Sequence, residues 1–326
     1  MPRKIIFDTD PGVDDAMAIQ LLLASPEFDL VGMTTVFGNT NVDQCTINAL
    51  RLLHLAGRDD VPVAKGASQP LNGKFGGGVP YVHGEDGQGN TYAPESPRSA
   101  VLQPAYKLIN ELVNQHPGEI TLVAVGPLTN LAILLHHHPE IVEKVAEVIV
   151  MGGNIYCPGN ITPAAEANIF NDPEAADRVF GAGWPITLIG LDVTHQVFMP
   201  EAAIYTLKEM EGAINQFVAS AVPYYLNFFK NNNQIEGIFV HDSSTLAYLL
   251  HPELFKAEKY PVRVDTSQSI SRGKTWIASS VSDSDSPFMA PWQNRQKVNV
   301  CYDVAGDKVA QLIVERLQIP IINKEA

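Results

Sequence analysis

The sequence predicts an α/β protein built on an open, mostly parallel, Rossmann-like doubly wound sheet. Short apolar, β-rich runs alternate with longer helical patterns, and this alternation is typical of βαβ units. Apolar residues make up 45% of the 326 residues and charged residues 18%, which is enough to bury a sizeable core. No stretch has the composition of an interdomain linker, and no internal repeat is present. We therefore expect a single domain over residues 1–326.

The elements follow from local patterns along the chain. The apolar run 4–8 predicts the first strand, and 16–24, which is apolar nearly all round, predicts a buried helix. Further strands are predicted at 30–37, 120–125, 145–151 and 186–191, with helical stretches at 47–56 and 128–135. The third quarter, 200–250, is predicted to be helical. A small C-terminal group of strands is then expected at 260–265, 275–279 and 298–302, followed by a last helix at 304–317.

Two long stretches fit neither a helix nor a strand. Residues 69–98 are rich in Gly, Pro and Ser, and 152–173 form the second such stretch. Loops of this length inside a compact domain are usually functional or disordered. In an open parallel sheet, ligands bind at the carboxyl ends of the strands, where such loops lie. We therefore expect the two loops to border a binding site.

Charge and cysteine usage restrict the class of protein. Lys and Arg number 22 against 36 Asp and Glu, a net charge of −14, so nucleic acid is an unfavourable partner. No apolar run approaches the ~18 residues needed to span a bilayer, and the N-terminus shows no signal-peptide pattern. The three cysteines, Cys45, Cys157 and Cys301, are far apart and lack CxxC spacing, which is typical of reduced thiols. The expectation is a soluble cytoplasmic protein with no membrane partner.

The first predicted strand ends in a cluster of carboxylates. Asp8, Asp10, Asp14 and Asp15 fall within eight residues, and the turn Pro11-Gly12 separates the two pairs. Helix capping and favourable interaction with the helix dipole explain one or two of these residues, but not four on a buried βα unit. Four neighbouring carboxylates repel one another unless a positive charge lies among them. The cluster therefore predicts a site for a hard cation.

Several cation-binding classes can be compared with this pattern. Calcium accepts irregular sites of six to eight oxygens and suits the cluster better than magnesium. An EF-hand is excluded because Ile19 stands where its bidentate Glu belongs. A haloacid-dehalogenase phosphatase also begins with strand-DxD, but here Pro-Gly-Val follows Asp10 and no later Gly-Asp-Gly pair is apparent. That phosphatase remains a distant alternative.

Three further segments could complete a site. His241-Asp242 lies just before a helical run, where Asp242 is a plausible N-cap and His241 adds a group that titrates near neutral pH. Val125 ends a strand and places a free carbonyl at the edge of the sheet. Glu166 and Asn168, in the second long loop, offer a carboxylate and an amide to hydroxyl groups.

Taken together, these motifs resemble the nucleoside hydrolases of the inosine–uridine-preferring family. The resemblance covers essentially the whole chain, and the motifs occur in the family's order and near its spacings. They are Asp8–Thr9–Asp10–Pro11–Gly12–Val13–Asp14–Asp15, Thr34–Thr35–Val36–Phe37–Gly38–Asn39, His83–Gly84–Glu85, residues 122–130, Val150–Met151–Gly152–Gly153, Asn160, residues 164–168, residues 172–176, residues 190–194 and His241–Asp242.

The resemblance implies two sets of site residues. The metal set would bind Ca²⁺ through three carboxylates and one backbone carbonyl, those of Asp10, Asp15, Asp242 and Val125. The substrate set would hold a small-molecule ribonucleoside and comprises Asp14, Asn39, Met151, Asn160, Glu166, Asn168, Tyr225 and Phe229. Within it, Asp14, Asn168 and Asp242 would meet the ribose 2′- and 3′-hydroxyls, and Asn160 and Glu166 the 5′-hydroxyl. A homo-oligomer, tetramer or dimer, is also expected.

The implied reaction is hydrolysis of the N-glycosidic bond to ribose and free base. It passes through an oxocarbenium-like ribosyl cation. Asp10 would accept a proton from a calcium-held water as general base, and His241 would protonate the departing base, with His83 as second candidate. The alternative from another class is a catalytically inactive calcium- or nucleoside-binding protein on the same fold, which would not need the general base.

Two departures from the family pattern concern the base. Many members have Phe where this chain has Ala167, and purine-capable members often have Tyr where it has Phe229. Because Phe229 cannot hydrogen-bond a leaving base, the sequence favours pyrimidine nucleosides such as uridine and cytidine as substrates, and inosine is an alternative substrate. Tyr225 and Phe229, four residues apart, could form an apolar lid on one helix face. Segments 76–90 and 225–237 are predicted to become ordered with ligand.

Overall fold

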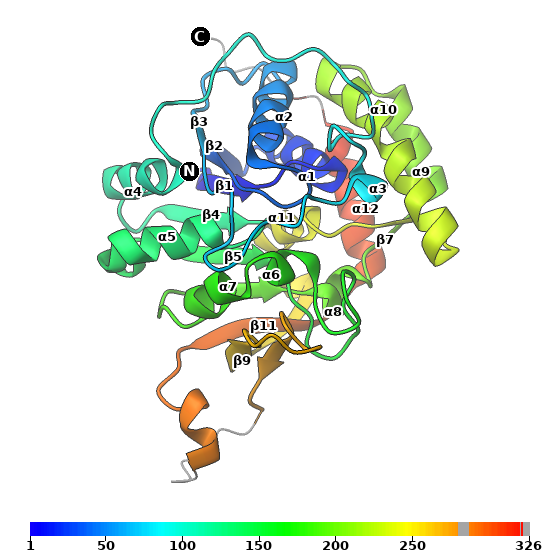
Figure 1. Cartoon of the computed structure of the whole chain (residues 1–326). Helices are drawn as coiled ribbons and strands as arrows, with labels where there is room; N and C mark the ends of the chain where they lie inside the picture. The colour runs from blue at the N-terminus through cyan, green and yellow to red at the C-terminus, as the bar shows by residue number, and fades with distance from the viewer. Residues whose placement is uncertain (280–286, 320, 322–326) are drawn as a thin grey trace.

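The computed structural model describes residues 1–279, 287–319 and 321. Within them a nine-stranded sheet runs through the molecule, and a two-stranded antiparallel ribbon lies beside it (Figure 1). The sheet contains β1 (Arg3–Thr9), β2 (Phe28–Thr35), β3 (Val63–Lys65), β4 (Ile120–Ala124), β5 (Glu147–Met151), β6 (Ile186–Ile189), β9 (Phe255–Val264), β10 (Thr275–Ile277) and β11 (Lys297–Val304). The ribbon pairs β7 (Phe198–Pro200) with β8 (Gly237–Phe239).

Helices cover both faces of this sheet. The longer ones are α1 (Val13–Ala24), α2 (Val42–Leu55), α4 (Ala105–Gln115), α5 (Thr129–His137), α7 (Pro173–Phe180), α10 (Ala213–Phe228), α11 (Ser243–Leu250) and α12 (Gly306–Leu317). The shorter ones are α3 (Pro80–His83), α6 (Ala167–Asn171), α8 (Leu191–Thr194), α9 (Glu201–Thr206), the 3₁₀ turns η1 (Pro139–Glu143), η2 (Leu207–Glu209), η4 (Pro252–Leu254) and η5 (Pro287–Trp292), and the π-helical turn η3 (Phe229–Asn233). None of the helices among the described residues has both the length and the apolar character to cross a membrane.

Alternation along the strands divides the core into two layers. In β1, Ile5 and Phe7 pack with α1, α2, α10, α11 and α12, whereas Ile6 packs with α4, α5 and α7 on the opposite face. Because successive side chains of a strand point to opposite faces, a parallel strand with helices on both sides must be apolar throughout. This explains why β1 and β4 appear in the sequence as continuous apolar runs. The predicted fold class is confirmed.

The strand order places the acidic motif at the centre of the sheet. The order is β10-β9-β11-β6-β5-β4-β1-β2-β3, and all pairs are parallel except those of β9 with β10 and with β11. Chain progression therefore reverses direction between β1 and β4, the position at which open α/β sheets bind ligands. Asp10 follows β1 and Val125 follows β4, so both lie at this switch point.

Some sequence-based expectations about elements were wrong. The loop 69–98 contains the helical turn α3, and 152–173 contains α6, although neither stretch shows helical periodicity. Residues 200–250 are not wholly helical, because β8 interrupts them. The expected C-terminal strands are present as β9, β10 and β11, and the sequence did not show that β11 pairs in parallel with β6 and so joins them to the main sheet. These pairings join segments far apart in the chain, which local patterns do not show. Cys45, Cys157 and Cys301 are free, as expected.

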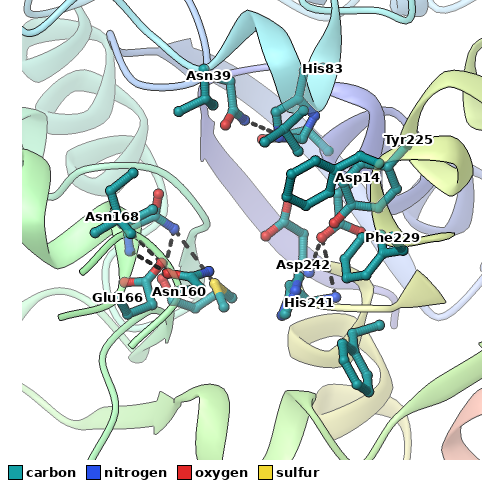
Figure 2. Close-up of a pocket in the computed structure, with 18 of the residues that line it drawn as sticks. Asp14, Asn39, His83, Asn160, Glu166, Asn168, Tyr225, Phe229, His241 and Asp242 are labelled. Carbon is teal, nitrogen blue, oxygen red and sulfur yellow. Dashed lines mark hydrogen bonds between the residues drawn. The ribbon is translucent and has the colours of Figure 1, made fainter. Parts of the chain in front are cut away.

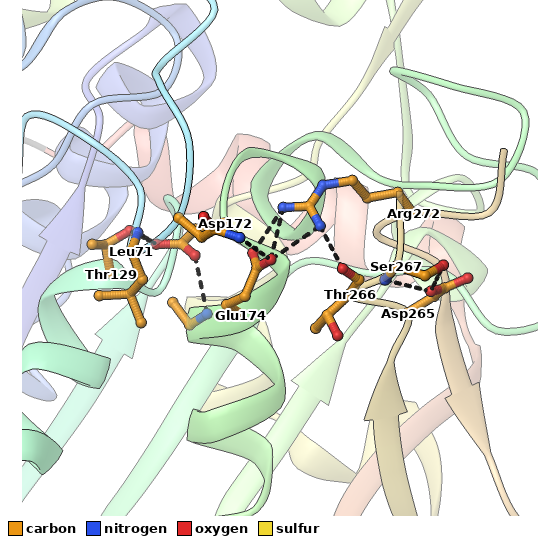
Figure 3. Close-up of polar contacts among 10 residues, drawn as sticks. Leu71, Thr129, Asp172, Glu174, Asp265, Thr266, Ser267 and Arg272 are labelled. Atoms are coloured by element: carbon orange, nitrogen blue, oxygen red, sulfur yellow. Dashed lines mark hydrogen bonds and ion pairs between the residues drawn. The ribbon is translucent and has the colours of Figure 1, made fainter. Parts of the chain in front are cut away.

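One buried carboxylate ties the loops near the site to the fold. Asp172, at the start of α7, accepts hydrogen bonds from Leu71 N (2.8 Å), Thr129 Oγ1 (2.7 Å) and Ala175 N (3.0 Å) (Figure 3). Leu71 belongs to the first long loop, and Thr129 begins α5 directly after the turn that carries Val125. One side chain thus fixes the first loop, the β4–α5 turn and the start of α7 together.

We predict that Asp172→Asn lowers the free energy of unfolding by about 1–3 kcal/mol, because the new amide N–H₂ must face one of three donors. Denaturant unfolding measures the change. The matched control is Asp43→Asn, which removes an exposed ion pair with Lys65 and should change stability by less than about 1 kcal/mol. Equal stability of the two variants would contradict the role assigned to Asp172.

Candidate active site

The acidic motif is buried at the carboxyl end of β1. Asp10, Asp14 and Asp15 are only 2%, 4% and 1% exposed, and the last two lie in the first turn of α1, as predicted. Glycines make room for them: a Cβ on Gly38 or Gly126 would lie 1.9 or 2.7 Å from an oxygen of Asp10. The chain therefore builds a close-fitting recess around a carboxylate.

Hydrogen bonds satisfy part of this cluster. Asn39 donates its backbone N–H to Asp10 Oδ2 (2.7 Å) and its amide to Asp15 Oδ2 (3.0 Å), where Gly12 N also donates. Asp14 Oδ2 accepts the backbone N–H groups of His241 (3.2 Å) and Asp242 (3.4 Å), which joins α1 to the β8–α11 turn. Asn39 thus contacts the acidic cluster, as the sequence predicted.

Other oxygens of the cluster have no donor. Asp8 Oδ2, Asp10 Oδ1 and Asp14 Oδ1 are buried without a hydrogen-bond partner in the described part of the chain. Burial raises the pKa of Asp10, Asp14, Asp15 and Asp242, and the charge of Asp15 raises the pKa of the other three further. Buried carboxylates without partners are costly, and a cation or a proton among them lowers that cost.

The donor set fits a hard cation. The acidic cluster offers oxygen only, which is the ligand chemistry that Ca²⁺ uses, and three of its oxygens are unpaired. Among the described residues, no three His, Cys, Asp or Glu side chains already stand together as a complete metal-ligand group. Backbone carbonyl and water oxygens would therefore have to complete the shell of any bound ion.

Asp242 lies at the predicted end of a helix, but its side chain does not cap that helix. It occupies the N-cap position of α11, but its side chain makes no capping hydrogen bond. It lines the cavity instead, and the charges of Asp15, Asp14 and Asp10 add to burial in raising its pKa. The predicted N-cap position is therefore correct but the capping bond is absent, and the carboxylate lies near those of the acidic cluster.

The second long loop supplies the opposite wall (Figure 2). The Glu166 carboxylate caps α6 by accepting the N–H groups of Asn168 (2.9 Å) and Ile169 (3.1 Å), and it also accepts that of Gly153 (2.8 Å). Asn168 Nδ2 donates to Val125 O (2.7 Å), and Asn160 Oδ1 accepts from Ala167 N (3.0 Å). Asn168 Oδ1 and Asn160 Nδ2 have no partner among the described residues.

Aromatic side chains from α10 and η3 close the cavity on a third side. The rings of Tyr225 and Phe229 meet edge to face at 4.9 Å, and both are buried. His83 stacks on Tyr225 at 5.2 Å and accepts the Val13 N–H at Nδ1 (3.1 Å). The Tyr224 hydroxyl donates to Pro80 O (3.0 Å), so α3 and α10 are joined directly.

Both candidate acids are neutral imidazoles. Burial lowers the pKa of His83 to about 3 and that of His241 to about 3. Because the Val13 N–H occupies Nδ1 of His83, its ring proton resides on Nε2. His241 Nδ1 lies 2.8 Å from Thr194 Oγ1, a hydroxyl that can either donate or accept.

The structure brings nearly all the predicted residues to one cavity of about 320 Å³. Its lining includes Asp14, Asp15, Asn39, His83, Val125, Met151, Asn160, Glu166, Asn168, Tyr225, Phe229, His241 and Asp242. Asp10 lies directly behind this lining, held by Asn39. The lining residues that the sequence analysis did not name individually are Val79, Tyr81, Val82, Gly159, Ile161, His195, Phe228, Asn233 and Phe239. Five of them fall within segments 76–90 and 225–237, which the sequence predicted to respond to ligand.

Comparisons with known proteins point to one family. A family described as "Inosine-uridine preferring nucleoside hydrolase" matches residues 5–311. "Probable uridine nucleosidase 1" of Oryza sativa subsp. japonica is 37% identical over 317 residues, 97% of each chain. A solved plant nucleoside hydrolase superposes with a TM-score of 0.94 at 39% identity, covering 98% of this chain and 100% of its own. A purine-preferring ribonucleoside hydrolase from Gardnerella vaginalis gives 0.89 at 30% identity, covering 97% and 98%.

We predict that segments 76–90 and 225–237 gain protection from hydrogen exchange together when a ribose-like inhibitor binds, because α3 and α10 contact each other directly beside the cavity. Exchange with and without saturating inhibitor measures this, with β5 as the internal reference. Unchanged protection in both segments would leave the lid hypothesis without support.

Proposed function

The chain belongs to the inosine–uridine-preferring nucleoside hydrolase family, and from this premise we propose that it is a Ca²⁺-dependent hydrolase with a preference for pyrimidine ribonucleosides. Hydrolysis of ribonucleosides at the N-glycosidic bond is the activity of the family. One observation supports both the calcium dependence and the preference for a ribonucleoside: buried acidic oxygens without donors and an aromatic wall line the same cavity. The first suits a cation and ribose hydroxyls, and the second suits a base.

The polar side chains can hold a ribose from two directions. Asp14 Oδ1 is unpaired on one wall, and on the other wall Asn168 Oδ1 and Asn160 Nδ2 have no partner among the described residues. Hydroxyl groups both donate and accept, so they can satisfy these three groups at once. We assign Asp14, Asn168 and Asp242 to the 2′- and 3′-hydroxyls, and Asn160 and Glu166 to the 5′-hydroxyl. Met151, whose carbonyl lies 3.3 Å from Asn168 Nδ2, supports the same wall.

The acidic cluster would hold the cation. Asp10, Asp15, Asp242 and the Val125 carbonyl are the proposed ligands, and the unpaired Oδ1 of Asp10 supports the assignment. When bound, Ca²⁺ would supply a water of lowered pKa and positive charge beside the ribose hydroxyls. Asp10 then accepts the proton of the attacking water, and the neighbouring carboxylates stabilise the positive charge that develops on the sugar.

Departure of the base requires a proton donor or hydrogen-bond donor near its ring. Each imidazole has its Nδ1 occupied, that of His83 by the Val13 N–H and that of His241 by Thr194 Oγ1. His241 is the better candidate because its ring borders Phe239 of the aromatic wall, with 6.4 Å between the ring centres. The ring of His83 stacks on Tyr225 and so supports that wall. We propose His241 as the main acid and His83 as a supporting residue.

Preference for pyrimidines rests on two points. Phe229 offers no hydrogen bond to a leaving base, and a 37% identical relative is named a uridine nucleosidase. The purine-preferring structure shows that the same fold accepts larger bases, so inosine is the second candidate. A reducing-sugar assay over uridine, cytidine, inosine, adenosine and guanosine tests the proposal. Uridine or cytidine should give the highest kcat/KM, and release of ribose from none of them would refute the proposed activity.

We predict that Asp10→Asn lowers kcat by about 10²–10⁴ while the fold and most nucleoside affinity remain, because the general base is lost. Steady-state kinetics and inhibitor binding measure the two effects separately. Asp8→Asn is the matched control: Asp8 is equally buried in β1, but its carboxylate bonds Thr34 and Asn130 outside the cavity. It should cost less than about tenfold. Near-normal turnover in Asp10→Asn would remove the general-base assignment.

We predict that chelation of the metal abolishes activity, that Ca²⁺ restores it, and that Mg²⁺ restores it poorly because it demands small octahedral geometry. Ca²⁺ should also raise the melting temperature of the metal-free protein, a readout independent of turnover. Full activity after demonstrated metal loss would contradict a catalytic ion.

A further inference from the structure

A third histidine lines the cavity and has no part in the mechanism above. His195 directly follows α8 and is half-buried in the cavity wall. Its ring packs against Phe239 at 4.9 Å and meets the ring of His241 edge-on at 5.7 Å. The preceding residue, Thr194, contacts His241 Nδ1. The end of α8 thus places the side chain of Thr194 in contact with the proposed acid, His241, and the ring of His195 beside it.

The imidazole of His195 is free to bind a ligand. Among the described residues neither of its ring nitrogens has a hydrogen-bond partner, in contrast to His83 and His241. Burial lowers its pKa, opposed by the charge of Asp192, so the ring is neutral near pH 7. A neutral imidazole carries one N–H donor and one acceptor nitrogen, and it can exchange the two by changing tautomer.

The surrounding wall offers a base few other polar contacts. Phe228, Phe229 and Phe239 present rings without polar atoms to the cavity, and these suit the faces of a base but leave the polar atoms on its edge unpaired. Burying such an edge without partners costs binding free energy. A polar side chain among the rings therefore decides which edges are accepted.

We propose that His195 hydrogen-bonds the edge of the nucleobase and is a specificity-determining residue of this enzyme. The proposal rests on the ribonucleoside hydrolase function given above. Uracil and cytosine exchange a donor for an acceptor at the 4-position, and a ring that can present either an N–H or a lone pair accepts both. His195 thereby supplies the base recognition that Phe229 cannot.

Kinetics of three variants test the assignment. His195→Phe keeps a ring against Phe239 and removes both nitrogens, His195→Asn keeps a donor and an acceptor, and His136→Phe is the matched control at the exposed end of α5. Each is assayed with uridine, with cytidine and with 4-nitrophenyl riboside, whose leaving group presents no pyrimidine edge and departs without protonation.

For His195→Phe we expect kcat/KM to fall by about 10- to 100-fold for both nucleosides, the range for one lost hydrogen bond and an unpaired edge, and by less than about threefold for the aryl riboside. His195→Asn should recover much of the loss, and His136→Phe should match the parent protein. Equal losses on all three substrates would show a packing role and overturn the proposal, as would unchanged nucleoside kinetics in His195→Phe. Failure of the parent protein to hydrolyse any of the substrates would instead refute the proposed function.

Discussion

Burial of carboxylates at the carboxyl end of β1 is the constraint on which the rest of the site depends. A charged oxygen removed from water needs donors or a cation. The fold provides donors from Thr9, Thr34, Asn39 and Asn130, which come from β1, β2, the loop after β2 and α5. These contacts draw the neighbouring strand ends around the motif. Asp10 Oδ1 and Asp14 Oδ1 nevertheless remain unpaired, so the fold leaves room for a ligand.

The same burial links protons, cation and stability. Burial raises the pKa of Asp8 to about 7 and that of Asp14 above its ordinary value. A carboxyl group whose pKa rises on folding stabilises the fold below its unfolded pKa, near 4, and that contribution is lost as pH rises through the folded value. A cation bound among the carboxylates would replace those protons. Metal binding should therefore matter most for stability on the alkaline side of neutrality.

The sequence predicted a site residue when the features that define its role lie close to it in the chain. The strand, the turn and the start of the helix are local features of the chain, and they were enough to predict Asp10, Asp14 and Asp15. The other site residues, including Asn168, were predicted only through motifs that resemble one family. For Asp242 the local pattern predicted the helix end correctly but also a capping bond that is absent, because its surroundings come from α1, more than two hundred residues earlier. Only the family resemblance grouped it with Asp10 and Asp15. No local pattern in the sequence indicates a role for His195, because its neighbours Phe239 and His241 are distant in the chain and contact it only in the folded protein.

The polar wall and the aromatic wall of the cavity are held in place by different parts of the fold. The acidic and amide side chains stand at strand ends and on loops tied to them, by Asn168 to Val125 and by Glu166 to Gly153, so their positions follow from the central sheet. The aromatic wall comes from α10 and η3, where Pro223 and a π-helical turn depart from regular α-helix, and from β8 beside them. Substitutions in this wall can alter the base contacts while the carboxylates stay in place. If the aromatic wall contacts the base as proposed, this separation would allow one fold to include a relative named for uridine and a structure named for purines, which are 37% and 30% identical to this chain.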